Sequence, residues 1–209
     1  MTKTNPTQNL VTAAQSGGAE SLAAAASAAS TGGSGGGLPP VERWNPPFCG
    51  DIDMRIARDG TWFYQGTPIG RPALVRLFAG ILWREGDRYY LVTPVEKVGI
   101  TVDDAPFLAT DFTAEGSGPT LALTFTTNVG DTVPAGPDHP LRCTLDPTTG
   151  EPSPYLRVRR NLDALIDRKS FYRLTDLATH TPHEGQHWFG LRSRGAFFPL
   201  IPSAALGEG

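Results

Sequence analysis

The stretch from Asp51 to Pro106 constrains the fold most, because strand, turn and helix signals follow one another within it. Residues 52–56 alternate between apolar and polar side chains, which is typical of a half-buried strand. The Asp59-Gly60 pair then predicts a tight turn into a short aromatic strand, Trp-Phe-Tyr. Pro72 stands where the first residue of a short amphipathic helix is expected. The order strand, turn, strand, helix and hairpin predicts a mixed α+β domain.

A second copy of this pattern occurs in the C-terminal half of the chain. The segment Arg71–Leu77 aligns without a gap on Arg168–Leu174, and the hairpin expected after each helix also matches. Two segments that match in the same order indicate a duplication, and only two copies indicate paired domains rather than a solenoid. We therefore predict two tandem, duplicated α+β domains, strand-rich and with one short helix each, over residues 38–95 and 96–209.

Residues 1–37 differ in composition from the rest of the chain, since they are rich in alanine, serine, threonine and glycine and contain no aromatic residue. Such a segment buries too little apolar surface to offset its ordering entropy, so we expect a disordered tail that ends in a flexible linker. The alanine-rich residues 20–30 favour at most a transient helix. A signal peptide is the alternative, but Leu10, Val11 and Leu22 are too few apolar residues for its hydrophobic region.

Composition excludes several functional classes. The formal net charge of −3 argues against a general nucleic-acid-binding protein, which would show a basic face. No apolar run approaches the roughly 20 residues that span a bilayer, so no membrane association is expected. Cys49 and Cys143 are the two cysteines, too few for a disulfide scaffold. We interpret them as reduced thiols, which predicts a cytoplasmic protein.

The central stretch also carries a family resemblance. The run DIDMRIARDGTWFYQGTPIGRPALVRLFAGIL, with YYLVTPVEKVGITVDDAPF after it, strongly resembles the bacterial family called domain of unknown function 1285. The resemblance continues through YLRVRRNLDALIDRKSFYRLTDLA to GAFFPL. It implies that the second domain superficially resembles a pleckstrin-homology fold. It also implies a role in signalling and a site for a nucleotide-like ligand at the domain interface.

A cluster of arginines is the best candidate for a binding site. Arg157 and Arg159 share one face of an expected strand, and Arg168 opens the second helix. Guanidinium groups can clamp a phosphate or a carboxylate while a tyrosine stacks on a base. Ion pairing with Asp163, Asp167 or Asp176 explains the arginines equally well. Glu96 and Lys97 form the opposite wall on the family resemblance alone. The candidate ligand-binding residues are Glu96, Lys97, Tyr155, Arg157, Arg159, Arg168 and Tyr172.

Catalytic and metal sites are not predicted. His180, His183 and His187 have a spacing that could bind zinc, but we interpret them as loop residues because no fourth ligand has motif spacing. The acidic pairs at 51/53 and 103/104 could chelate magnesium, but such pairs more often face solvent. No nucleophile motif is present. We therefore expect no catalytic residue, no metal ligand and no cofactor.

The sequence favours a non-enzymatic signalling or regulatory protein that binds a small anionic ligand, for example a nucleotide-like one, where its two domains meet. A protein partner in signalling is also expected. The alternative is a protein-interaction adaptor that binds a peptide along an exposed strand edge of the second domain. A metal-dependent hydrolase is a third, weaker alternative.

Overall fold

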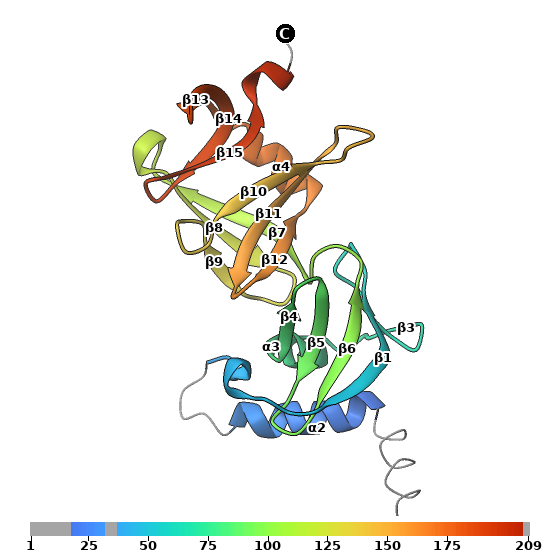
Figure 1. Cartoon of the computed structure of the whole chain (residues 1–209). Coiled ribbons are helices and arrows are strands. Elements are labelled where there is room, and N and C mark those ends of the chain that lie inside the picture. The colour runs from blue at the N-terminus through green and yellow to red at the C-terminus, as the bar shows by residue number, and fades with distance from the viewer. Residues whose placement is uncertain (1–17, 32–36, 207–209) are drawn as a thin grey trace, which may run out of the picture. The chain divides into compact units, whose positions relative to one another are not determined.

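A computed structural model describes residues 18–31 and 37–206, and these residues form two compact units. The first unit ends at Val102, and the second begins at Asp103. The turn Arg58–Gly60, although it lies between two strands of the first unit, belongs to the second. Both units combine a six-stranded sheet with a short helix (Figure 1), which confirms the predicted tandem α+β architecture.

The first unit is built on a sheet with the strand order β3-β2-β1-β6-β5-β4. Its strands are β1 (Phe48–Ile56), β2 (Trp62–Tyr64), β3 (Thr67–Pro68), β4 (Leu82–Glu85), β5 (Arg88–Val92) and β6 (Lys97–Val102). β1 and β6 are parallel, and the other neighbours are antiparallel. Because β6 pairs with β1, this unit extends beyond the predicted boundary at Val95. Local patterning does not reveal such a long-range parallel pairing.

Helix α3 (Pro72–Gly80) follows β3 and begins at Pro72, as the sequence predicts. Proline suits the first helical position because the amide hydrogen that it lacks would have no partner within the helix there. Phe78 is fully buried, and its ring stacks on Trp62 of β2 with the ring centroids 6.2 Å apart. This contact joins the helix to the sheet through the hydrophobic core of the first unit.

Helix α2 (Gly18–Thr31) corrects the expectation of a tail without stable structure. Leu22 and Ala26 lie one helical turn apart, are 3% and 0% exposed, and belong to a helix that contacts α3 (Figure 1). Alanine is the best helix former, and its small side chain allows two helices to approach closely. Tertiary packing thus stabilises a helix that composition alone leaves marginal. The rest of the predicted tail lies outside the described residues.

The second unit contains a sheet with the order β10-β11-β12-β7-β8-β9 and a three-stranded sheet, β13-β14-β15. Strands β7 and β12 are parallel. The strands are β7 (Phe107–Glu115), β8 (Ala122–Thr127), β9 (Thr132–Pro134), β10 (Leu141–Leu145), β11 (Pro152–Arg159), β12 (Leu162–Ile166), β13 (Thr179–His183), β14 (Gln186–Ser193) and β15 (Ala196–Pro202). Short 3-10 helices lie at Val41–Arg43, Gly118–Thr120 and Ser203–Leu206.

Buried contacts connect the two sheets of the second unit. The rings of Phe112 on β7 and Phe125 on β8 pack with their centroids 5.6 Å apart. Ser193 at the end of β14 is fully buried, accepts a hydrogen bond from Leu123 N at 2.9 Å and donates one to Ala135 O at 2.7 Å. Because a buried hydroxyl needs such partners, this serine fixes the three-stranded sheet against β8.

Helix α4 (Arg168–Thr175) lies between β12 and β13 and is capped by Asp167, whose carboxylate accepts a hydrogen bond from Ser170 N at 2.7 Å. The antiparallel hairpin β4-β5 follows α3 directly, whereas β13 lies between α4 and the corresponding hairpin β14-β15 of the proposed repeat. The hairpins differ in their place in the fold, because β4-β5 joins the main sheet whereas β14-β15 belongs to the separate sheet. In the described part of the chain, no helix is long and apolar enough to cross a membrane.

Candidate functional site

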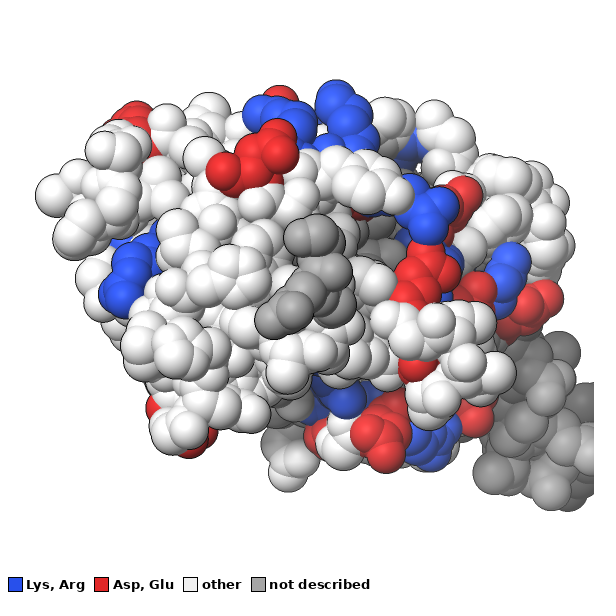
Figure 2. Space-filling model, turned by 90° about the horizontal axis from the view of Figure 1, so that it is seen from above, with Lys and Arg blue, Asp and Glu red and all other residues white. Residues whose placement is uncertain are grey.

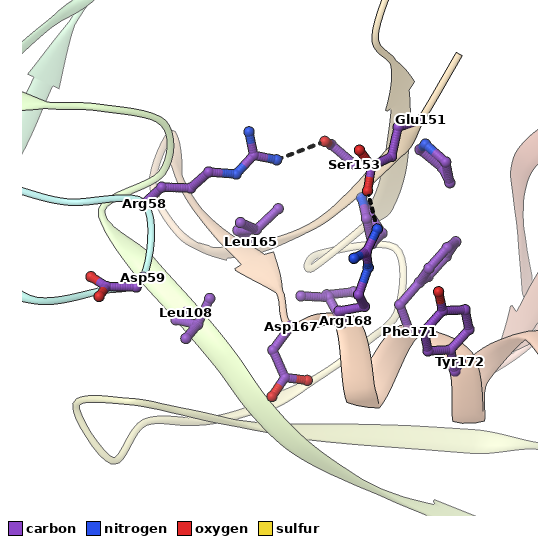
Figure 3. Close-up of a pocket in the computed structure, with 13 residues that line it drawn as sticks. Arg58, Asp59, Leu108, Glu151, Ser153, Leu165, Asp167, Arg168, Phe171 and Tyr172 are labelled. Carbon is purple, nitrogen blue, oxygen red and sulfur yellow. Dashed lines mark hydrogen bonds and ion pairs between the residues drawn. The ribbon is translucent and has the colours of Figure 1, made fainter. Parts of the chain in front are cut away.

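A cavity of about 830 Å³ lies in the second unit at the beginning of α4 (Figure 3). Its apolar floor includes Leu108 of β7 and Leu165 of β12, which are paired in the register of the two parallel strands. The chain leaves β12 and enters α4 directly through Asp167, so the sheet places the start of the helix beside this floor. The sequence thus builds one wall of the cavity from a single strand-to-helix connection.

Arg58 contributes a guanidinium group from the turn between β1 and β2. Its Nη2 donates to Ser153 Oγ at 3.0 Å, and its Nε lies 3.3 Å from Asp104 Oδ2. Ser153 also lines the cavity, whereas the Asp104 side chain is largely buried. The Asp104 carboxylate and the Ser153 hydroxyl therefore both contact this largely exposed arginine, and Figure 3 shows the contact with Ser153.

Gly60 fixes the same turn. Its carbonyl accepts a hydrogen bond from Asn128 Nδ2 at 3.2 Å, and Asn128 Oδ1 accepts one from Leu108 N at 3.0 Å. The backbone of Gly60 has φ +82°, and a Cβ atom there would lie 2.6 Å from Asn128 Nδ2. Glycine is required here for two reasons. Other residues rarely adopt this backbone conformation, and their Cβ atom would collide with the side-chain amide of Asn128. The turn that carries Arg58 is thereby held against β7.

Arg168 is the first residue of α4 and supplies a second guanidinium group to the cavity. It forms an ion pair with Glu151, which stands just before β11 (Figure 3). The two side chains are 71% and 58% exposed, so water screens the pair. Glu151 also offsets the unfavourable position of a cation at a helix N-terminus.

Aromatic rings from α4 complete the lining. Phe171 is buried, whereas Tyr172 is 62% exposed and is among the most exposed of the large hydrophobic side chains described. Figure 3 shows both rings beside Arg168. An exposed ring next to a guanidinium group can stack on a flat ligand whose charged group the arginine holds.

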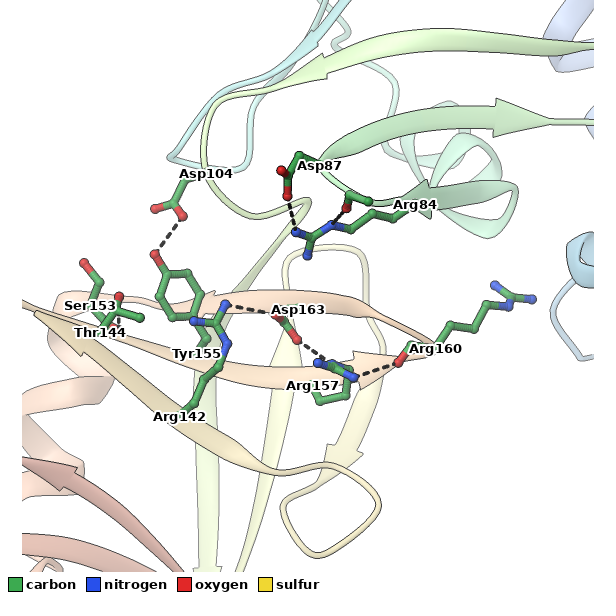
Figure 4. Close-up of polar contacts among 11 residues, drawn as sticks. Arg84, Asp87, Asp104, Arg142, Thr144, Ser153, Tyr155, Arg157, Arg160 and Asp163 are labelled. Atoms are coloured by element: carbon green, nitrogen blue, oxygen red, sulfur yellow. Dashed lines mark hydrogen bonds and ion pairs between the residues drawn. The ribbon is translucent and has the colours of Figure 1, made fainter. Parts of the chain in front are cut away.

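Of the predicted site residues, the structure brings Arg168 and Tyr172 together at this cavity. Tyr155 and Arg157 lie instead in a polar network on β10, β11 and β12 (Figure 4). Arg157 Nε donates to Asp163 Oδ1 at 2.6 Å, and Arg142 Nη2 donates to Asp163 Oδ2 at 2.9 Å. Arg157 is thus engaged in one of the ion pairs that the sequence offers as the alternative to ligand binding.

Tyr155 links this network to the cavity through Asp104. Its hydroxyl donates to Asp104 Oδ1 at 2.7 Å, while the other carboxylate oxygen faces Arg58. The guanidinium of Arg142 lies 4.0 Å from the centroid of the Tyr155 ring. Burial, and then the hydrogen bond to Asp104, raise the pKa of Tyr155. The phenol therefore keeps its proton and positions the carboxylate that holds Arg58.

Arg159 lies apart from the cavity lining. It forms an ion pair with Asp131, and its guanidinium lies 4.6 Å from the ring centroid of Phe107. The side chain is only 12% exposed. A buried arginine between a carboxylate and an aromatic ring contributes to the packing of the unit. No sequence spacing indicates Asp131 as its partner.

Glu96 and Lys97 belong to the first unit. Lys97 Nζ donates to Glu85 Oε2 at 2.6 Å, and this hydrogen bond lowers the pKa of Glu85. The Lys97 ammonium also lies 4.2 Å from the ring centroid of Tyr90. The backbone amide of Glu96 donates to Thr93 Oγ1 at 3.1 Å. In this unit Lys97 borders a cavity of about 80 Å³, which is too small for a nucleotide.

The three histidines do not converge. His180 is paired with Phe189, and His187 with Pro182, which places His180 and His187 on one face of the β13-β14 hairpin. His183 falls on the opposite face, since neighbouring strand residues alternate. His180 Nδ1 shares a hydrogen bond with Ser203 Oγ at 2.8 Å. Among the described residues, no group of three His, Cys, Asp or Glu could hold a metal ion.

Sequence reasoning did not identify Arg58, Glu151, Ser153 or Phe171 as site residues. The turn at Asp59-Gly60 is visible in the sequence, but its membership in the second unit depends on tertiary contacts with Asn128. The Gly150-Glu151-Pro152 segment reads as a loop, and nothing local relates its glutamate to Arg168. The missing information is the pairing of strands far apart in the chain.

The fold and the cavity define a class of protein: two tandem strand-rich α+β units, with a ligand-sized cavity in the second. A protein-family model described as "Domain of unknown function (DUF1285), N-terminal domain" matches residues 39–105. A second model, "Protein of unknown function (DUF1285), C-terminal domain", matches residues 106–200. The chain therefore belongs to the DUF1285 family, which confirms the resemblance seen in the sequence.

Two crystal structures of family members are similar to this chain. A DUF1285 family protein from Silicibacter pomeroyi DSS-3 is 62% identical, with a TM-score of 0.78 over 88% of this chain and 97% of that one. A DUF1285 family protein from Shewanella baltica OS155 is 32% identical, with a TM-score of 0.47 over 60% of this chain and 91% of that one. No curated protein matches the chain.

Proposed function

We propose that this protein is a non-enzymatic regulatory protein that binds a small anionic ligand of nucleotide type in the cavity of its second unit. The observation that carries the proposal is the presence of Arg58, Arg168 and the exposed ring of Tyr172 on one cavity. Among the described residues, the lining contains no histidine, cysteine or lysine, so Ser153 has no imidazole or amine base beside it in the cavity. This composition favours binding over catalysis.

The two guanidinium groups, of Arg58 and Arg168, suit a small anion that both can contact. Guanidinium groups donate several hydrogen bonds in a fixed plane, which matches the oxygens of phosphate and carboxylate. Arg58 already contacts Asp104 and Ser153, so part of its conformational freedom is lost before a ligand binds. The volume of about 830 Å³ falls within the range of roughly 300–1,000 Å³ that is typical of small-molecule sites.

The remaining lining suits a flat, partly apolar group. Leu108 and Leu165 provide the floor, and Phe171 and Tyr172 provide rings at one side. Stacking of a base on an aromatic side chain contributes about 1–3 kcal/mol, which is comparable to one charge-assisted hydrogen bond. A nucleoside monophosphate combines a flat ring and a phosphate in one molecule.

The charges on one face of the molecule favour a local site over a basic binding face there. Figure 2 shows one face of the molecule, on which basic and acidic side chains are interspersed around an uncharged area. Together with the net charge of −3, this favours recognition of a single small anion over nucleic acid.

The edge strands argue against the alternative function, an adaptor that binds a peptide along an exposed strand edge. Proline has no amide hydrogen to donate to an added strand, so edge strands that contain it are poor templates for a peptide. Within residues 18–31 and 37–206, four of the six edge strands contain proline: β3, β9, β13 and β15. In the second unit, where the adaptor alternative places the peptide, β10 is the described edge strand without proline.

Calorimetric titration with the four ribonucleoside monophosphates tests the proposal. We expect at least one to bind, and Arg168→Gln to weaken that binding about tenfold or more, as loss of a charge-assisted contact does. Arg173→Gln is the matched control, since Arg173 is an exposed arginine of the same helix that pairs with Asp111 away from the cavity. Absence of binding to the parent protein, or equal binding by Arg168→Gln, would overturn the proposal.

A further inference from the structure

We infer that Glu151 is a built-in competitor at this site: its carboxylate occupies Arg168 when the cavity is empty and must leave before a ligand phosphate can bind. This inference rests on the proposed function and adds a regulatory feature and a ligand preference to it. The ion pair between Glu151 and Arg168 lies on the cavity lining itself (Figure 3). The Glu151 carboxylate thus occupies the position beside Arg168 that the anionic group of a ligand would take.

The backbone around Glu151 is held independently of that ion pair. Asp146 Oδ1 accepts hydrogen bonds from Thr148 N at 2.9 Å and Thr149 N at 2.8 Å. Asp146 N donates to Glu151 O at 2.9 Å, and Gly150 N donates to Asp146 O at 2.8 Å. The turn between β10 and β11 is thus closed by its own hydrogen bonds. The Glu151 side chain can leave Arg168 while the turn stays intact.

The contact that must break is weak. Both side chains are more than half exposed, and exposed ion pairs typically contribute about 0–1 kcal/mol. An incoming phosphate offers Arg168 more charge than one carboxylate does, and the guanidinium of Arg58 and the hydroxyl of Ser153 line the same cavity as further hydrogen-bond donors. Displacement of Glu151 by a phosphate is therefore favourable.

The same competition disfavours carboxylate ligands. Glu151 is tethered beside Arg168, so its effective concentration there is in the millimolar range or above. A ligand carboxylate offers Arg168 the same single charge and must compete with this tethered group. The structure thus predicts a preference for a phosphate over a carboxylate on an otherwise identical aromatic ligand.

Phenyl phosphate and benzoate are matched probes, because they share the ring and differ in the anionic group. In calorimetric titrations we expect the parent protein to prefer phenyl phosphate. Glu151→Gln should bind phenyl phosphate about two- to fivefold more tightly, the change that loss of one exposed ion pair allows, and should narrow the preference over benzoate. In an Arg168→Gln background, Glu151→Gln should have no effect, because the two residues act through one contact.

Glu184→Gln controls for net charge, since Glu184 is an exposed glutamate of the second unit that does not line the cavity. If Glu151→Gln binds no more tightly than the parent while Arg168→Gln loses binding, the competitor role is wrong and the proposed site stands. If Glu184→Gln gives the same gain as Glu151→Gln, the effect is general electrostatics and the competitor role is again wrong. If no variant binds phenyl phosphate, or Arg168→Gln binds it normally, both proposals fail.

Discussion

Arg157 Nε donates to Asp163 Oδ1 at 2.6 Å, and the Asp163 side chain is only 8% exposed. A carboxylate so deeply buried needs its partners, because loss of one leaves charge that water cannot solvate. The guanidinium of Arg157 is also held by the carbonyl of Arg160 at 3.1 Å. These contacts assign Arg157 to the architecture of the second unit.

Arg157→Gln should therefore lower the free energy of unfolding by about 1–3 kcal/mol while leaving nucleotide affinity unchanged. Urea denaturation gives the first quantity, and calorimetry gives the second. The parallel change Arg168→Gln, which removes a screened pair, should shift stability by less than about 1 kcal/mol. An Arg157 variant that keeps its denaturation midpoint but loses nucleotide binding would show that the arginine serves the ligand.

Helix α2 should contribute to stability, because Leu22 is buried on a helix that contacts α3. We expect Leu22→Ala to lower the free energy of unfolding by about 2–5 kcal/mol, as for other buried leucines. Ser21→Ala is the control, since that side chain is exposed on the same helix. An unchanged urea midpoint in Leu22→Ala would mean that α2 does not pack on the protein in solution.

Gly60 should be required for both stability and binding, because it fixes the turn that carries Arg58. Gly60→Ala adds backbone strain and a collision with Asn128, which together should cost about 2–4 kcal/mol. Gly66→Ala separates the two effects, since Gly66 has φ +71° but nothing within 4 Å of the added Cβ. Equal losses of stability in the two variants would show that Asn128 does not constrain the turn.

Alkaline pH should destabilise the second unit. Burial raises the pKa of the Cys143 thiol from 9.0 to about 11, so the folded state retains this proton longer than the unfolded state does. The associated stability is fully present below pH 9 and is lost as the pH rises towards 11. The free energy of unfolding should therefore fall between pH 9 and 11, and Cys143→Ala should flatten that fall. An identical pH profile in the variant would refute this assignment.

Local signals predicted much of the fold. Pro72 marks the start of α3, and Asp59-Gly60 marks the turn between β1 and β2, because both depend on backbone preferences within a few residues. The parallel pairing of β1 with β6 depends on contacts far apart in the chain, so the domain boundary at Val95 fell short of Val102. Helix α2 was underestimated because its stability comes from packing rather than from composition.

The candidate site was predicted only in part, for a related reason. Arg168 and Tyr172 both line the candidate cavity, as proposed from the sequence, because a recognisable helix start places them on the same short helix. Asp163, the partner of Arg157, was among the ion-pair partners that the sequence offered, whereas Asp131, the partner of Arg159, lies between β8 and β9 and was not. A strand pattern gives the face of a side chain, whereas its partner depends on which strands lie beside it.

The most direct test is a crystal structure of the protein with adenosine monophosphate. The phosphate oxygens should lie about 3 Å from the guanidinium groups of Arg168 and Arg58, as hydrogen-bonded groups do. The base should stack on Tyr172, and the Glu151 carboxylate should have turned away from Arg168. Nucleotide bound elsewhere, with the Glu151–Arg168 ion pair intact and the cavity empty, would contradict the assignment of this cavity as the ligand site.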